Sequence, residues 1–193
     1  MTRSLITLRS PDWLVALERR SKQAFPDVEE RMDFVIGLSR KNIAVGAGGP
    51  FGAAVFNSDD GTLLSCGVNL VLDGRCSMLH AEIAAIIRAQ IKTGTHDLSA
   101  SGLPPFELVT STEPCVMCFG AVTWSGIKRL VCGARREDAE YIGFDEGEKP
   151  LTWKEALENR GIEVLRDVLR NEAASVLKEY RKRGGRIYNP QRS

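Results

Sequence analysis

The chain has 193 residues, of which 43% are hydrophobic and 26% are charged. This composition is typical of a globular domain and excludes a disordered, collagen-like or disulfide-scaffold protein. The 26 Lys and Arg residues nearly balance the 25 Asp and Glu residues, and the pI is about 7.6. That balance disfavours, without excluding, a protein that binds nucleic acid mainly through its phosphates.

No repeat, low-complexity tract or linker divides the chain, so we expect a single domain over residues 1–193. The apolar runs are far shorter than the roughly 20 residues of a membrane span, and residues 1–10 lack the apolar centre of a signal peptide. These features predict a cytoplasmic protein. Its 5 cysteines are an odd number, which in a reducing compartment favours metal binding or simple burial over disulfides.

Hydrophobic periodicity and turn residues predict helices that alternate with short strands. In chain order we expect a helix over Pro26–Val45, a strand over Phe51–Phe56, a strand after Gly61 to about Val71, a helix over His80–Gln90 closed by Gly94, a strand over Phe106–Thr110, a helix over Cys115–Trp124, a strand over Leu130–Gly133, one or two helical turns over Arg136–Tyr141, a strand over Ile162–Leu165 and a helix over Asn171–Lys182. Strands separated by helices of this length predict an α/β sandwich, with the sheet covered on both faces.

Two short motifs carry the candidate chemistry, His80-Ala81-Glu82 and Pro114-Cys115-Val116-Met117-Cys118. Cys115 and Cys118 are three residues apart, which places both thiols on one face of a helical turn. The helix N-terminus and a bound cation both lower a thiol pKa and favour the thiolate, the form that binds zinc. His80 supplies a third ligand from the start of the neighbouring predicted helix.

Three protein ligands leave one tetrahedral position of a zinc ion for water or hydroxide, which distinguishes a catalytic site from a structural one. Glu82 is then well placed beside that water as a general acid/base. The alternatives are a structural zinc site or two buried thiols. A structural site needs a fourth ligand, and the remaining cysteines and the second histidine are expected in the core or in loops: Cys66 and Cys132 in the core, Cys76 and His96 in loops.

The two motifs match the H-x-E…P-C-x-x-C signature of zinc-dependent nucleobase deaminases. The sequence resembles the cytidine deaminase superfamily, and more narrowly its bacterial guanine deaminase branch, over a core of about residues 48–148. The resemblance is carried by these two motifs together with Gly49-Pro50-Phe51-Gly52-Ala53, Gly67-Val68-Asn69 and Gly143-Phe144-Asp145-Glu146. It implies a three-layer α/β/α sandwich around a mixed five-stranded sheet, one zinc ion per chain and a homodimer.

The resemblance also implies roles for individual residues. His80, Cys115 and Cys118 would hold zinc, and Glu82 would carry protons from the water to the ring and the leaving amine. The resemblance also implies contacts with a purine base from an amide, an aromatic wall and two further motif residues: Asn69, Phe51, Ala81 and Asp145. Tyr188 is a candidate for a lid, because the C-terminal segment of resembling enzymes can cover the pocket.

Glu146 bears on the choice of substrate. Guanine carries N–H groups at N1 and on the C2 amine, and a carboxylate along that edge accepts both protons. The relatives more often have Asp at this position, so Glu146 could bind the base, assist the leaving group, or do both. Asp145 is the alternative substrate ligand, and a solvated acidic loop is the alternative without function.

Two other functions fit part of the sequence. A transfer-RNA adenosine deaminase has nearly the same zinc motif, but it would need a basic surface, and the basic residues cluster only at the last predicted helix. Cations complement the dipole at a helix C-terminus, which favours a solvated helix end. A catalytically silent deaminase-like subunit is the other alternative. The intact Glu82 disfavours it, because such a subunit does not need a carboxylate beside the metal.

Overall fold

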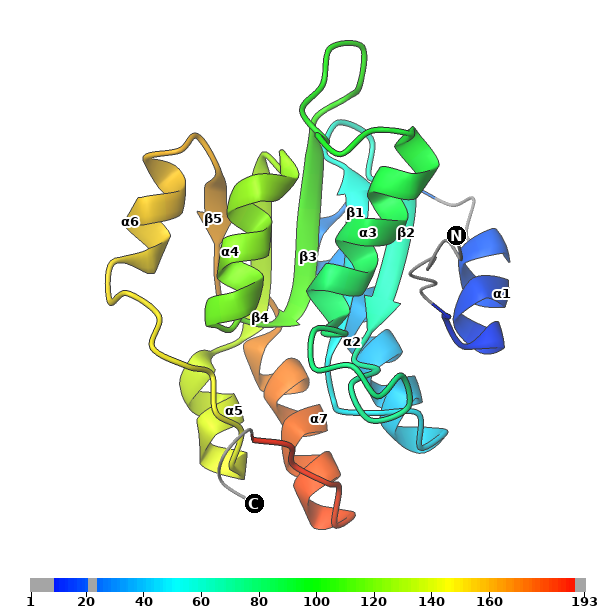
Figure 1. The fold of residues 1–193 in the computed structure, drawn as a ribbon, viewed down its shortest axis with the longest axis vertical. Coiled ribbons are helices and arrows are strands. Elements are labelled where there is room, and N and C mark those ends of the chain that lie inside the picture. The colour runs from blue at the N-terminus through cyan, green and yellow to red at the C-terminus, as the bar shows by residue number, and fades with distance from the viewer. Residues whose placement is uncertain (1–8, 21–23, 190–193) are drawn as a thin grey trace, which may run out of the picture.

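The computed structural model describes residues 9–20 and 24–189. Its centre is a five-stranded sheet in the order β2-β1-β3-β4-β5 (Figure 1). In chain order the strands are β1 (Gly52–Asn57), β2 (Leu63–Val68), β3 (Phe106–Thr112), β4 (Arg129–Ala134) and β5 (Glu163–Leu165). β1 is antiparallel to β2 and β3, whereas β3, β4 and β5 are mutually parallel. The mixed five-stranded sheet expected from the resemblance is confirmed.

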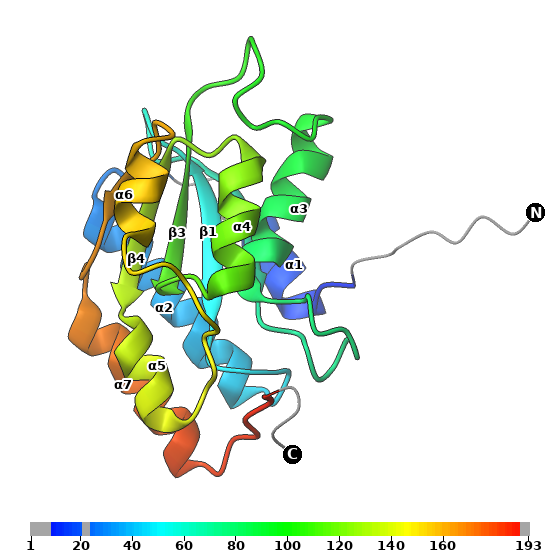
Figure 2. The ribbon, with the colours of Figure 1, turned by 60° about the vertical axis from the view of Figure 1, so that its left-hand side comes forward.

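Helices cover both faces of this sheet (Figure 2). They are α1 (Asp12–Arg20), α2 (Val28–Ala44), α3 (Ala81–Thr93), α4 (Val116–Ser125), α5 (Arg136–Ile142), α6 (Trp153–Glu158) and α7 (Arg170–Lys182). Buried residues of α1, α2, α5 and α7 belong to one hydrophobic cluster, and those of α3, α4 and α6 belong to the other. In the described part of the chain, no helix combines the length and the apolarity that a bilayer crossing requires.

The two cores lie on opposite faces of the sheet because successive strand residues point to opposite sides. In β1, Ala54 and Phe56 contribute to the cluster beneath α2 and α7, whereas Ala53 and Val55 contribute to the cluster beneath α3 and α4. All four side chains are fully buried. Burial on both faces explains why the sequence of β1 is a continuous apolar run rather than an alternating one.

The structure corrects several predicted boundaries and adds two helices. α3 continues to Thr93 instead of Gln90. β2 ends at Val68 instead of about Val71, because the chain turns away from β1 after Asn69 and Leu70 N–H donates to Leu79 O at 2.9 Å. β3 continues to Thr112. α4 begins at Val116, so Cys115 is its N-cap residue rather than part of the helix. The short helices α1 and α6 had no predicted counterpart.

Gly67 allows α3 to pack directly on β2. A Cβ atom at this position would overlap the backbone oxygen of Ala81 and the backbone nitrogen of Ala85. Because glycine has no side chain, the first turn of α3 lies against the strand backbone. This contact sets the distance between the sheet and the helix end that begins at His80.

Candidate active site

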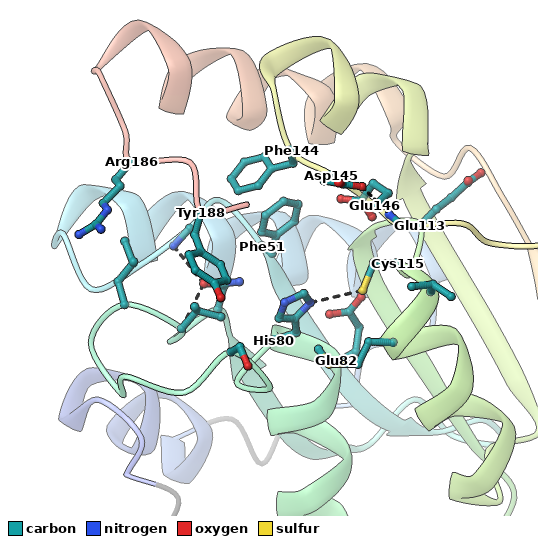
Figure 3. Close-up of a pocket in the computed structure, with 18 residues that line it drawn as sticks. Phe51, His80, Glu82, Glu113, Cys115, Phe144, Asp145, Glu146, Arg186 and Tyr188 are labelled. Carbon is teal, nitrogen blue, oxygen red and sulfur yellow. Dashed lines mark hydrogen bonds between the residues drawn. The ribbon is translucent and has the colours of Figure 1, made fainter. Parts of the chain in front are cut away.

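Two helix N-termini converge beside the sheet and bring the three predicted metal ligands together. Figure 3 shows two of them, His80 and Cys115. His80 is the N-cap residue of α3, and Cys115 is the N-cap residue of α4. The backbone carbonyls of both residues already accept helical hydrogen bonds, at 3.0 Å and 2.8 Å respectively. Cys118 lies one turn into α4 and is fully buried. The helical starts therefore fix all three side chains in place.

The spacing of these three side chains fits zinc. His80 Nδ1 lies 3.5 Å from Cys115 Sγ and 3.6 Å from Cys118 Sγ, and the three ligand atoms all lie within 4.8 Å of one another. A tetrahedral ion with Zn–S and Zn–N bonds of about 2.3 and 2.1 Å places sulfur and nitrogen ligands about 3.6 Å apart. His80, Cys115 and Cys118 could thus hold zinc without rearrangement.

The site stabilises a thiolate at Cys115. Hydrogen bonds from Cys118 and from His80 lower the pKa of the Cys115 thiol to about 4. A helix N-terminus favours negative charge in the same direction. Cys66 and Cys132 differ because burial raises the pKa of both thiols well above the ordinary value. Both lie in the core as predicted.

Glu82 points into the cavity that His80 and Cys115 line (Figure 3). Its side chain belongs to the first turn of α3 and the residue is only 6% exposed. Burial and the negative charge of Cys115 raise the pKa of Glu82 to about 7. A carboxyl group with a pKa near neutrality can both accept and donate a proton, which is the property of a general acid/base.

Glu146 is another buried carboxylate of the cavity, at 6% exposure. Burial, Cys115 and Glu82 raise the pKa of Glu146 to about 8. Asp145 also lines the cavity, but its Oδ1 accepts the Gly147 N–H at 2.9 Å, and its own N–H donates to Asn189 Oδ1 at 3.0 Å. The structure therefore brings both predicted acidic residues to the cavity and gives Asp145 a turn-forming role as well.

The cavity has a volume of about 370 Å³, within the roughly 300–1,000 Å³ of small-molecule sites. Asn69 lines it, and its Oδ1 accepts the N–H groups of Gly49 and Val71, each at 3.4 Å. The amide oxygen is thus engaged with the backbone, and the –NH₂ group remains the donor that Asn69 can offer to a ligand.

Aromatic side chains form one side of the cavity. Phe51 and Phe144 line it and pack edge to face with ring centroids 4.9 Å apart. The Phe144 ring also stacks on Tyr180 at 6.2 Å. Tyr180 donates from its hydroxyl to Arg186 O at 2.6 Å, so this buried ring anchors the C-terminal segment. Tyr188 of that segment reaches the cavity, as the lid prediction requires.

The structure leaves several residues away from the cavity. Ala81 is fully buried in the core and is not among the lining residues, so its contact with a substrate stays a prediction. His96 is exposed in the loop after α3, as expected. Cys76 is exposed in the loop before His80 and does not line the cavity.

Sequence reasoning missed several lining residues that come from loops. They are Val71, Leu72, Ser77 and Arg186. None belongs to a motif, and loop residues show no periodicity that would indicate which side chains face a cavity. Glu113 also lines the cavity; it precedes the Pro114-Cys115 motif, but no role followed from its position in the sequence.

Comparisons with known proteins agree with this geometry. Guanine deaminase from Bacillus subtilis is 35% identical over 111 residues, which cover 58% of this chain and 67% of that protein. The solved structure of guanine deaminase from Nitrosomonas europaea has a TM-score of 0.89 and 51% identity, covering 94% of this chain and 98% of that chain. A structure in complex with 2,6-diaminopurine has a TM-score of 0.90 and 52% identity, covering 95% and 96%.

The structural similarity therefore extends well beyond residues 48–148. Residues 27–134 match the family described as the cytidine and deoxycytidylate deaminase zinc-binding region. This match spans both metal-ligand motifs, and the three ligand atoms have the spacing that zinc requires. The chain belongs to the zinc-dependent cytidine and deoxycytidylate deaminase family.

Proposed function

We propose that this protein hydrolyses guanine to xanthine and ammonia. The observation that carries the proposal is that the buried carboxylates of Glu82 and Glu146 line one cavity beside a three-ligand metal centre. The similarity to guanine deaminases from two organisms supports guanine as the substrate.

In the reaction, the oxygen of water bonds to C2 of guanine, the bond from C2 to the exocyclic nitrogen breaks, and that nitrogen leaves as ammonia. Zinc, when bound, lowers the pKa of a coordinated water so that attack is possible at neutral pH. Glu82 takes the two protons of the attacking water in turn, passing one to the ring nitrogen N3 and the other to the departing nitrogen. Its side chain suits this task because its pKa is raised to about 7.

The remaining residues would bind and orient the base. In its ionised form, Glu146 accepts the N–H groups at N1 and on the C2 amine, which adenine and cytosine do not present in that pattern. Asn69 donates from its amide to the ring. Phe51 packs against the base as a wall of the cavity, and Tyr188 closes over it.

The first test is an assay of the zinc-loaded protein with free guanine, in which xanthine and ammonia are both measured. Equal amounts of the two products confirm the proposal. Absence of turnover with guanine, together with formation of inosine in transfer RNA, would assign the chain to the adenosine deaminase reaction instead. Absence of both reactions in protein that holds zinc would support a silent subunit.

Two basic residues at the end of α7 already have partners within the protein, which favours a free base over RNA as the substrate. Arg181 donates to Tyr141 O at 2.7 Å and lies over the Tyr141 ring, while Arg183 pairs with Glu179 at 2.5 Å. Arg181 and Arg183 therefore bond to groups at the ends of α5 and α7. We place the enzyme in the cytoplasm, where free purine bases occur in metabolism.

Replacing Glu146 by glutamine should lower kcat/KM for guanine by about 10–100-fold, as expected for the loss of a hydrogen bond to a charged group. The amide turns one acceptor into a donor that faces the N–H groups of the base. Zinc content should stay at one ion per chain. Asp145→Asn is the matched control, because the two acidic residues are adjacent. If that variant shows the larger loss, Asp145 is the substrate ligand.

We also propose that the protein is a homodimer that associates through α3 and α4. α4 is apolar on nearly its whole circumference, yet Trp124 is 84% exposed and Val116 is exposed as well. Ile91 at the end of α3 is 70% exposed. A helix that is apolar on its whole circumference is normally buried on all sides. The sheet covers only the inner side of α4, so its outer side remains for a partner chain.

Trp124→Glu should therefore convert a dimer into a monomer, since it places a charge at the centre of the proposed interface. Light scattering coupled to size-exclusion chromatography measures the mass directly. Val45→Glu is the control, because Val45 is also exposed but caps α2 on the other face of the sheet. A Trp124→Glu protein that keeps the mass of two chains would contradict the interface.

A further inference from the structure

The loop that carries Glu146 crosses the N-terminus of α4 at close range. The Val116 N–H donates to Glu146 O at 3.0 Å, so the first residue of α4 bonds to the backbone of the loop. Gly147 makes the approach possible, because a Cβ atom there would overlap the side chain of Val116. The loop and the metal-binding turn are thus in direct backbone contact.

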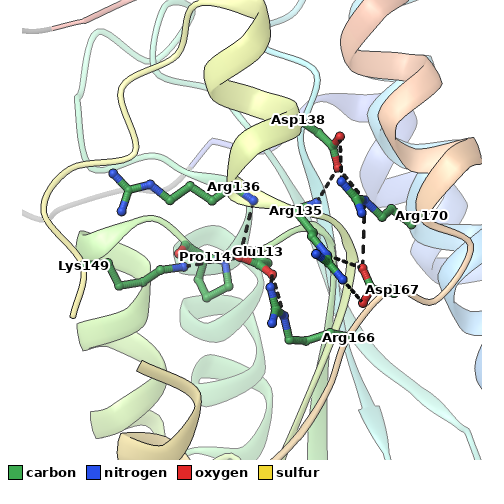
Figure 4. Close-up of polar contacts among 9 residues, drawn as sticks. All are labelled: Glu113, Pro114, Arg135, Arg136, Asp138, Lys149, Arg166, Asp167 and Arg170. Carbon is green, nitrogen blue, oxygen red and sulfur yellow. Dashed lines mark hydrogen bonds and ion pairs between the residues drawn. The ribbon is translucent and has the colours of Figure 1, made fainter. Parts of the chain in front are cut away.

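Lys149 makes a second connection between the same two segments (Figure 4). Its Nζ donates to Pro114 O at 2.8 Å, and Pro114 immediately precedes the ligand Cys115. The ammonium group also lies 4.1 Å from the centre of the Trp153 ring and 3.8 Å from Glu113 Oε2. Lys149 is only 6% exposed, so these groups replace most of its hydration.

The carboxylate of Glu113 has hydrogen-bond donors other than Lys149. Its Oε1 accepts from Arg166 Nε at 2.7 Å, and its Oε2 accepts from the backbone N–H of Arg136 at 3.3 Å (Figure 4). The bond to Pro114 O is different, because it joins a residue three positions after Glu146 to the residue before a metal ligand. Removing Lys149 would break this bond and leave the Glu113 pair with Arg166 intact.

Burying a lysine is costly, and an apolar side chain of similar length would pack in the same space at lower cost. Burial lowers the pKa of Lys149, which shows the direction of that penalty. A buried cation that is costly to bury and that bonds to the metal-binding turn is therefore better explained by the site than by the fold.

We propose that Lys149 is a positioning residue that holds the Glu146 loop against the turn bearing Cys115. Through its bond to Pro114 O it keeps the substrate carboxylate at a constant distance from the metal ligands. The tether itself follows from the contacts described above, whereas its effect on catalysis rests on the proposed role of Glu146 in guanine hydrolysis.

The catalytic part is tested with Lys149→Met, which keeps the length and removes the donor. A misplacement of about 1 Å can cost about 100-fold in rate, so we expect kcat/KM for guanine to fall by about 10–100-fold while zinc stays at one ion per chain. In the Glu146→Gln background the same change should cost less than about 3-fold, because the positioned carboxylate is already gone. Lys154→Met is the control, since Lys154 is a solvent-accessible lysine of α6 paired with Glu158.

An equal loss in both backgrounds would show a general structural role and overturn the proposal, as would unchanged kinetics. The tether is tested separately by hydrogen exchange of the Val116 amide, followed by NMR without substrate. Lys149→Met should accelerate this exchange at least several-fold and leave core amides of β3 unchanged. If the unmodified protein fails to hydrolyse guanine, the proposed function is wrong. The Val116 exchange then decides the tether alone, and an unchanged rate refutes it.

Discussion

Replacing Glu82 by glutamine should reduce kcat for guanine by about 10²–10⁴-fold, the usual contribution of a general acid/base. Glutamine has the same shape but cannot take a proton from water. The zinc content and the melting temperature should stay close to those of the unmodified protein, because Glu82 lies beside the ligands without being one of them. Its burial and its pKa of about 7 are both consistent with a group that changes its protonation state during turnover.

Glu158→Gln is a suitable control for this variant, because Glu158 is a solvent-accessible residue of α6 that pairs with Lys154. Steady-state kinetics, metal analysis and a thermal melt should be done on the same preparations. A Glu82→Gln protein that keeps more than about half of its kcat would remove Glu82 from proton transfer and leave that step to Glu146. Loss of zinc in this variant would indicate instead that Glu82 helps to hold the metal.

Replacing Cys115 by serine should remove both zinc and activity. The thiolate is the zinc ligand, and the hydroxyl of serine stays protonated at neutral pH. With one ligand gone, we expect less than about 0.1 zinc per chain after dialysis and no detectable turnover. The melting temperature should fall as well, because an ion that binds only the folded state stabilises it.

Cys76→Ser is the matched control, since this thiol is exposed and lies outside the cavity. It should keep one zinc ion and full activity. Chelation of the unmodified protein should reproduce the effect of Cys115→Ser, and added zinc should restore activity only in the unmodified protein. A Cys115→Ser protein with full zinc occupancy would show that Cys115 is not a ligand.

The sequence predicts those helices and motifs that are determined by residues close together in the chain. The helix over His80–Gln90 was found because its apolar residues recur at helical spacing and Gly94 ends it in a left-handed conformation. The metal ligands were found for the same reason, since each motif is a few residues long and begins a helix. The sulfur–nitrogen distances then confirmed their convergence.

Features that depend on tertiary packing could not be predicted from the sequence. Periodicity could not give the strand order, and the resemblance implied only that the sheet is mixed and has five strands; the order came from the structure. Lys149 was missed because a single lysine in an acidic, glycine-containing loop looks like a solvated residue, and only the fold shows that Trp153 and Glu113 enclose it. The short helix α6 was missed because six residues are too few to show a period.

Gly67 shows how far the constraints of the site extend. This residue touches neither the metal ligands nor the cavity, yet any side chain there would push α3 away from β2. His80 and Glu82 would move with the helix, while Cys115 and Cys118 would stay on α4. When all substitutions at Gly67 are selected for activity, glycine should therefore be recovered almost exclusively. Distance from the cavity alone would suggest that this position tolerates substitution.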